Sequence, residues 1–187
     1  MGMTRNEAAA ALSDIERTTE RGQVLRGYRI AGPILMLWGL IWAAGYVAMG
    51  LLAPERWGQL WIVLDVVGVV GSLVLSRSAG SARRGEAMAM NWRMVVGMLA
   101  GLVFFFGTFT LFQASTVEPY LAFPGLVTGL VYIGMGLWRM PRYLWIGATL
   151  MIATMVGYVF FQPLLTFWMA GFGGGGLFLA GLWLRKI

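Results

Sequence analysis

The chain has 187 residues, of which 59% are hydrophobic and 12% are charged, and its formal net charge is +6. Soluble domains carry about 25% charged residues, so this composition excludes an ordinary soluble domain and predicts a polytopic membrane protein. The chain contains no cysteine and no histidine, which removes disulfides, thiolate chemistry, imidazole bases and the commonest metal ligands. We expect no metal and no cofactor. The basic residues lie at the ends of apolar runs and form no stripe, so we expect no nucleic-acid partner either.

The first 29 residues are mostly polar and predict a cytoplasmic amphipathic helix over 4–21 with a juxtamembrane segment after it. The signals are a capping box, a narrow apolar face and a terminating glycine, carried by Thr4, Glu7, Leu12, Ile15 and Gly22. Three arginines oppose four acids in this helix, so we do not expect it to lie on anionic lipid. Two alternatives stay open: a solvated helix that packs on the cytoplasmic loops, or a docking site for a soluble partner.

Residues 30–187 predict a single transmembrane domain of six helices. Six apolar runs of about 20 residues occur at 30–52, 59–76, 94–112, 119–138, 143–161 and 164–184. Each must be helical, because lipid offers no hydrogen-bond partner to an open backbone. Pro33 is expected in the first turn of the first helix, and Pro124 is expected to kink the fourth. The predicted fold is an all-α polytopic membrane bundle.

The basic residues predict the orientation of this bundle. Of the 14 Lys and Arg, only Arg56 lies in a loop on the second side. All the others lie in the N-terminal segment, in the loops around 77–93 and 139–142, or at the C-terminus. The positive-inside rule then places both termini in the cytoplasm.

The second half of the chain contains a weak internal repeat. The segment "RMVVGMLAGLVFFFGTFTLFQ" (93–113) resembles "RYLWIGATLMIATMVGYVFFQ" (142–162), and the helices that follow end in "GLVYIGMGLWR" and "GLFLAGLWLR". One interpretation is three tandem helical hairpins in parallel orientation, as occur in transporters. The alternative is chance, because apolar helices converge easily in composition.

The stretch "ALSDIERTTERGQVLRGYRIAGPILMLWGLIWAAGY", which leads into six spans that end in "GLWLRKI", resembles small six-helix inner-membrane proteins of proteobacteria. The resemblance covers most of the chain. It implies a multi-pass protein of the bacterial inner membrane, and it carries over no activity and no site residue.

No signature of a membrane enzyme is present, so we expect no catalysis. Zinc proteases of the membrane need histidines, which are absent. Ser72 in "GVVGS" has no general base to activate its hydroxyl. Only one acidic residue lies within the spans, so no acid cluster is available for a catalytic metal.

That acid, Asp65, is the strongest candidate for a functional residue. On a helix it shares a stripe with Trp61, Gly68, Ser72 and Ser76, opposite a wall of valines, which predicts that it points into the bundle. A charged acid inside a membrane costs about 2.5–3.5 kcal/mol on insertion scales. It therefore marks either a functional site or a protonated or tyrosine-bonded acid that only ties the second helix to the first. At matching depth we expect hydrogen-bond donors from Tyr46 and, if the repeat is real, from Tyr158. The predicted proton or cation site consists of Asp65, Tyr46, Ser72 and Tyr158.

The glycine run "GFGGGG" lies midway along the sixth predicted helix. Gly171, Gly174 and Gly175 belong to pairs of small residues four apart, which predict close helix packing in lipid. The alternative is a break in the helix at the bilayer midplane that exposes backbone groups to a solute.

Two functions follow from these patterns. The first is a small transporter or channel for a proton, a small cation or an amphipathic solute, with Asp65 as its site. The second is a non-transporting sensor or regulatory subunit that acts through its N-terminal helix. The partners expected are the lipid bilayer, a second copy of the chain in a homo-oligomer, and a cytosolic protein at the N-terminal helix.

Overall fold

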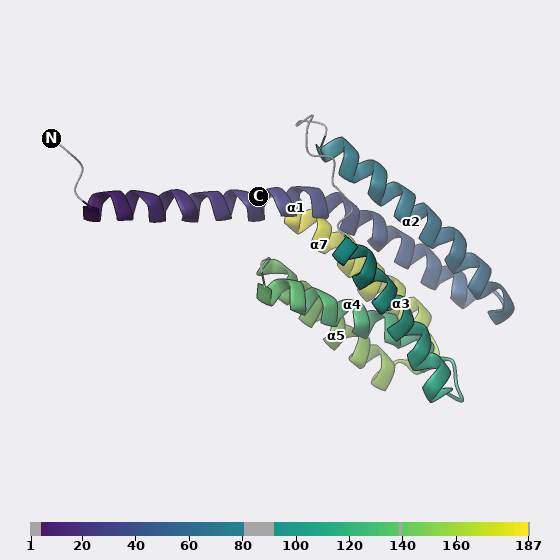
Figure 1. Ribbon diagram of the computed structural model, residues 1–187. Coiled ribbons are helices and arrows are strands. Elements are labelled where there is room, and N and C mark those ends of the chain that lie inside the picture. Colours follow the sequence, from purple (N-terminus) through teal and green to yellow (C-terminus); the bar gives the residue numbers. More distant parts are fainter. Residues whose placement is uncertain (1–4, 81–91, 139, 187) are drawn as a thin grey trace.

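The computed structural model describes residues 5–80, 92–138 and 140–186. Every long element in these residues is a helix (Figure 1), which confirms the all-α prediction. The long helices are α1 (Arg5–Leu51), α2 (Trp57–Gly80), α3 (Trp92–Phe112), α4 (Glu118–Trp138) and α5 (Arg142–Phe160). A sixth is continuous but changes type along its length, from α6 (Leu165–Trp168) through the π-helical η3 (Met169–Gly175) to α7 (Gly176–Arg185). Short 3-10 turns precede the second and the sixth, at η1 (Pro54–Arg56) and η2 (Gln162–Leu164).

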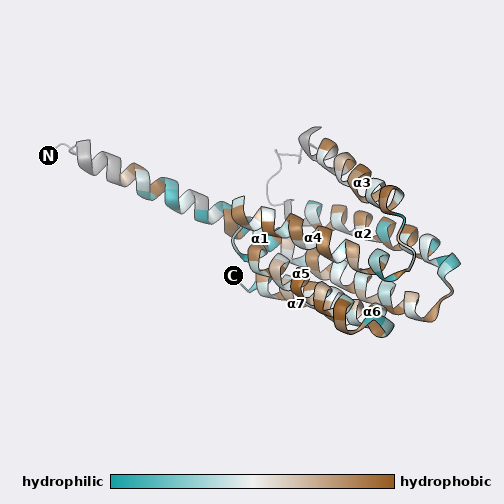
Figure 2. Ribbon diagram, turned by 90° about the horizontal axis from the view of Figure 1, so that it is seen from below, coloured by the Kyte–Doolittle hydropathy of each residue, from teal (hydrophilic) through white to brown (hydrophobic). Residues whose placement is uncertain are grey.

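Five segments of the described chain are long and apolar enough to cross a membrane. They are Ala11–Leu51, Pro54–Arg77, Glu118–Trp138, Arg142–Phe160 and Gln162–Arg185. Within the described residues, the apolar part of α3 is shorter and covers Leu99–Phe112, so the third of the six predicted crossings stays a prediction. Figure 2 shows the apolar residues along the bundle and the hydrophilic ones toward the N-terminal end of α1. This pattern is that of a membrane protein.

Helix α1 corrects two details of the sequence interpretation. It runs without interruption for 47 residues, so Gly22 does not end a separate N-terminal helix. Pro33 lies in the interior of α1 and not in a first turn. Proline removes one backbone donor and usually interrupts a helix. Here the helix stays continuous, but its axis changes direction where α1 enters the bundle (Figure 1). The N-terminal half of α1 extends away from the bundle as a single rod.

The core of the bundle lies between α1, α4, α5 and the sixth helix. Helices α4 and α5 form the most extensive pair, and α1 packs along almost the whole of η3 and α7. The second pair joins the first helix of the chain to the last, so the packing does not follow the three predicted hairpins. The buried side chains come mainly from these elements and include Leu35, Tyr46, Leu150, Leu165, Met169 and Leu184.

Helices α2 and α3 lie on the outside of this core. Helix α2 packs on α1. The four valines predicted to face lipid are all exposed, with exposed fractions between 51% at Val67 and 61% at Val63. Helix α3 is held to α4 by aromatic side chains, with the Phe109 ring stacked on Tyr120 at 4.5 Å and Phe105 and Phe109 against Phe123. Fewer neighbours surround both helices than surround α1.

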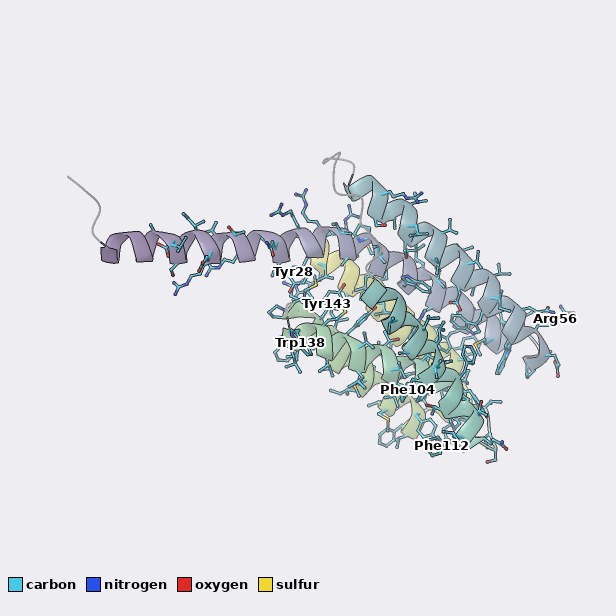
Figure 3. The ribbon with its side chains drawn as sticks, in the orientation of Figure 1. Tyr28, Arg56, Phe104, Phe112, Trp138 and Tyr143 are labelled. Carbon is cyan, nitrogen blue, oxygen red and sulfur yellow. The ribbon has the colours of Figure 1, made fainter. Side chains whose placement is uncertain are left out.

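The two ends of the bundle differ in charge. Arg56 lies at one end, beyond the last turn of α1, while Tyr28, Trp138 and Tyr143 lie at the other (Figure 3). Arg142 and Arg185 are at this second end, because Arg142 contacts Trp183 of α7 and Arg185 reaches Met36 of α1. The separation of basic residues that the sequence predicts is therefore present in space.

Candidate functional site

Asp65 does not point into the bundle of the single chain. The face of α2 that meets α1 is formed by Leu64, Gly68 and Gly71, since Leu64 packs against the core and a Cβ on either glycine would meet Trp38 or Leu37. Asp65 lies beside this face and is exposed. Among the described residues, no hydrogen bond or ion pair joins its carboxylate to a partner. Its predicted inward orientation is wrong, and its role as a proton or cation site stays a prediction.

Ser72 and the tryptophans of α1 form a packing contact between α1 and α2. The indole N–H of Trp38 donates to the Ser72 hydroxyl at 3.1 Å, and the Trp38 ring fills the space left by Gly68. Trp42, four residues further along α1, stacks edge-on against Tyr46 at 5.9 Å. Ser72 and Trp38 thus join α2 to α1, whereas the contact between Trp42 and Tyr46 lies within α1.

Tyr46 is almost fully buried, with 2% of its surface exposed. Its hydroxyl donates to the carbonyl oxygen of Leu121 at 2.8 Å, which ties α1 to α4. Leu121 lies next to Tyr120, whose carbonyl loses its helical partner because Pro124 has no N–H. Tyr46 therefore joins α1 to α4 one residue away from this carbonyl, and no hydrogen bond joins it to Asp65.

Tyr158, on α5, is partly buried against the core, and no hydrogen bond joins its hydroxyl to another described residue. The four residues of the predicted proton or cation site thus lie on three helices with separate partners, and the structure does not bring them together. In addition, no group of three or more His, Cys, Asp or Glu in the described part of the chain could hold a metal ion.

We expect Tyr46→Phe to lower the free energy of unfolding by about 1 kcal/mol, because it removes a buried hydrogen bond between α1 and α4. Tyr158→Phe is the matched control and should leave the stability unchanged. Thermal unfolding of both variants in detergent micelles measures the difference. Equal stability of the two variants would mean that the Tyr46 hydroxyl contributes nothing.

The glycine run forms a widened, π-helical turn and does not break the helix. Gly174 packs directly on α1, since a Cβ there would meet the backbone of Ala43, whereas Gly171 and Gly175 have no such neighbour within 4 Å. Gly39 and Gly181 extend the same contact, facing Phe178 of α7 and Gly32 of α1 respectively. Turns of π-helix are rare and are frequent at functional sites.

An apolar groove lies beside this π-helical turn, between α5 and α7. It has a volume of about 280 Å³ and is open along one side. Its floor is formed by Ile146, Leu150 and Leu177, and its rims by Trp145 and Trp183 at one end and Phe172 at the other. Gly176 opens into it, with no atom within 4 Å of where a Cβ would lie. Thr149 is the only polar side chain in the lining.

Arg142 connects this groove to α1. Its guanidinium lies over the Trp183 ring at 4.7 Å and over the Tyr28 ring at 5.7 Å, and it donates to the Trp183 carbonyl at 3.2 Å. The backbone N–H of Arg142 donates to the Tyr28 hydroxyl at 3.1 Å. Tyr28 is buried against Tyr143 and is the first buried residue of α1 in the described chain. One arginine therefore touches both the rim of the groove and the base of the projecting segment of α1.

Sequence analysis missed both the groove and this junction. Arg142 was assigned only to orientation, and Trp183 was given no role in a site. The available signal was an arginine at the start of α5 and a tryptophan near the end of α7, but their pairing depends on which helices are neighbours.

The described residues form a helical bundle with five helices long and apolar enough to cross a membrane, an apolar groove and a projecting first helix. No known protein family matches the chain, and neither the curated proteins nor the solved structures contain a match to it.

Proposed function

We propose that the protein is a non-transporting membrane sensor or regulatory subunit, in which the bundle receives a signal and the projecting segment of α1 (residues 5–27) passes it on. The observation that carries this proposal is the continuity of α1, whose C-terminal half forms the core and whose N-terminal half leaves it. From Tyr28 to Leu12 the rod is about 24 Å long at 1.5 Å per residue. A small tilt of α1 in the bundle is therefore enlarged at its tip.

The projecting segment has the surface of a docking site for a soluble cytosolic protein. Leu12 and Ile15 lie three residues apart on one face and are 59% and 63% exposed. Neither packs on the rest of the described chain, and an exposed apolar pair of this kind fits a docking site. Acids and arginines balance in this segment, which disfavours a lipid surface as the occupant.

The orientation that fits this proposal places both termini in the cytoplasm of a bacterium, with the bundle in its inner membrane. The support is the separation of Arg56 from all other basic residues along the chain. Reporter fusions to the C-terminus and to the loop at 81–91 should be active only on the cytoplasmic side. Activity of either fusion on the outer side would contradict this orientation.

The proposed function is tested by a distance between spin labels, which the cysteine-free chain allows. Labels at Leu12→Cys on the projecting segment and at Leu137→Cys on α4 are both at exposed positions. Gly176→Leu fills the groove without a bound ligand, and we expect it to shift the 12–137 distance by about 2 Å or more, since helices shift by 1–2 Å at such contacts.

Gly134→Leu is the matched control, because a Cβ at Gly134 has no neighbour within 4 Å and this residue is outside the groove. Electron–electron double resonance in nanodiscs gives the distance distributions. Identical distributions for Gly176→Leu and Gly134→Leu would contradict the proposal that the bundle moves α1.

A second candidate function, proton or cation transport, is favoured by one observation. Asp65 lies midway along the candidate span Pro54–Arg77, exposed and without a partner in the described chain. A membrane acid in this position needs shielding, and in a homo-oligomer a second copy packed on α2 provides it. The predicted spans contain few polar residues, which disfavours a wide aqueous path for polar solutes and favours small ions.

Transport is tested in proteoliposomes that contain a pH-sensitive dye. The sensor proposal predicts that a pH gradient decays no faster than in protein-free vesicles, and at the same rate with Asp65→Asn, which keeps the shape but cannot ionise. Rapid decay in the wild type that Asp65→Asn abolishes would establish transport instead.

A further inference from the structure

We propose that the groove between α5 and α7 binds an anionic phospholipid, with one acyl chain along the groove and the phosphate at Arg142. This inference rests on the proposed sensor function and names the class of its ligand. The groove, its aromatic rims and the arginine at its end each carry part of the argument.

The dimensions of the groove match one leaflet of a bilayer. It runs along the sixth helix from Phe172 to Trp183, about 16 Å at 1.5 Å per residue. Half of a hydrocarbon core of about 30 Å is 15 Å. The lining is apolar apart from Thr149. Gly176 has no side chain, so the groove is unobstructed at this position. An extended acyl chain fits this shape and chemistry, whereas a polar solute would leave its hydrogen bonds unmade.

The end of the groove near Trp183 supplies the positive charge for a head group. Arg142 uses one donor on the Trp183 carbonyl, and a guanidinium has five N–H donors. No acidic residue pairs with Arg142 in the described part of the chain. Arg185 and Lys186 follow at the end of α7. A guanidinium binds a phosphate in a bidentate manner. Because Arg142, Arg185 and Lys186 are all positive and no described acidic residue pairs with Arg142 to receive a cationic head group, an anionic phospholipid is favoured over a zwitterionic one.

Binding at this place has a direct consequence for α1. The Arg142 guanidinium lies over both the Trp183 and the Tyr28 rings, so a phosphate that draws it toward the groove weakens its contact with Tyr28. Tyr28 is at the base of the projecting segment of α1. The lipid thereby acts on the element that the proposed function uses as its output.

The test measures lipid retention by native mass spectrometry on the full-length protein. Purified protein is incubated in detergent with dioleoylphosphatidylglycerol or dioleoylphosphatidylcholine. We expect one tightly held phosphatidylglycerol in the wild type and about a tenfold weaker preference for it in Arg142→Gln, the loss expected for charge-assisted hydrogen bonds. Gly176→Leu should remove the bound lipid, and Gly134→Leu should retain it as the wild type does. Arg29→Gln, an exposed arginine on α1, controls for general loss of charge.

Three outcomes would overturn the proposal: equal retention of the two lipids by the wild type, unchanged preference in Arg142→Gln, or an equal loss of preference in Arg29→Gln. A fourth outcome is that the protein retains inorganic phosphate as tightly as it retains phosphatidylglycerol. The site would then bind an anion and not a lipid. Failure here is separate from failure of the sensor proposal. If Gly176→Leu shifts the 12–137 distance but no lipid preference exists, the sensor proposal stands and the lipid assignment falls.

Discussion

Replacing Gly174 with leucine should destabilise the bundle more than any other single substitution considered above. A Cβ at this position meets the backbone nitrogen and Cα of Ala43, and a backbone cannot move aside as a flexible side chain can. Helices α1 and η3 must then separate along a contact that Gly39 and Gly181 extend in both directions. Overpacking of this kind costs 1–3 kcal/mol and occasionally more, so we expect a loss of about 3 kcal/mol in the free energy of unfolding.

The next residue provides a matched control. Gly175 has no neighbour within 4 Å, so Gly175→Leu should change the free energy of unfolding by no more than about 0.5 kcal/mol. Titration with a denaturing detergent, followed by circular dichroism, measures both variants under the same conditions. If Gly174→Leu is as stable as Gly175→Leu, then α1 and η3 are not in close contact in the membrane.

Much of this fold could be predicted from the sequence, because the membrane imposes a simple rule. Apolar runs of about 20 residues must be helices, and the ends of α2, α4 and α5 lie within a few residues of the predicted limits. The separation of Arg56 from the other basic residues was also predicted, and it is seen for Arg142 and Arg185, which lie at the opposite end of the bundle. Gly22 was read as a stop, but the sequence on both sides favours helix strongly enough to continue through it.

The orientation of Asp65 could not be predicted, because periodicity defines the stripes on a helix but not which stripe meets a neighbour. The contact face of α2 is centred on Leu64, Gly68 and Gly71, and Asp65 lies about 90° around the helix from that centre at 100° per residue. This face of α2 meets α1 because the Trp38 ring packs into the space beside Gly68. The contact face of α2 therefore depends on a residue of α1, and it cannot be read from the sequence of α2 alone.

The groove could not be predicted for a related reason. Its lining comes from α5 and the sixth helix, and it exists because η3 is a π-helix that widens at consecutive glycines. The glycine run predicted either packing or a break. The structure has packing at Gly174 and an open surface at Gly176, two residues apart on opposite sides of one helix.

The central claim is that α1 is one uninterrupted helix from the bundle to its projecting end. One distance tests this claim most directly. Spin labels at Leu12→Cys and Leu40→Cys lie on exposed positions of α1, one in the projecting segment and one within the bundle. For a continuous helix, 28 residues at 1.5 Å each give about 42 Å between the two backbone sites.

We expect electron–electron double resonance in nanodiscs to give one narrow distribution near that distance. A variant with three glycines inserted after Gly22 should broaden the distribution, because the insertion introduces a hinge. A wild-type distribution that is already broad, or centred well below this distance, would show a hinge in α1. It would contradict the claim that movement in the bundle is transmitted along α1 to its projecting segment.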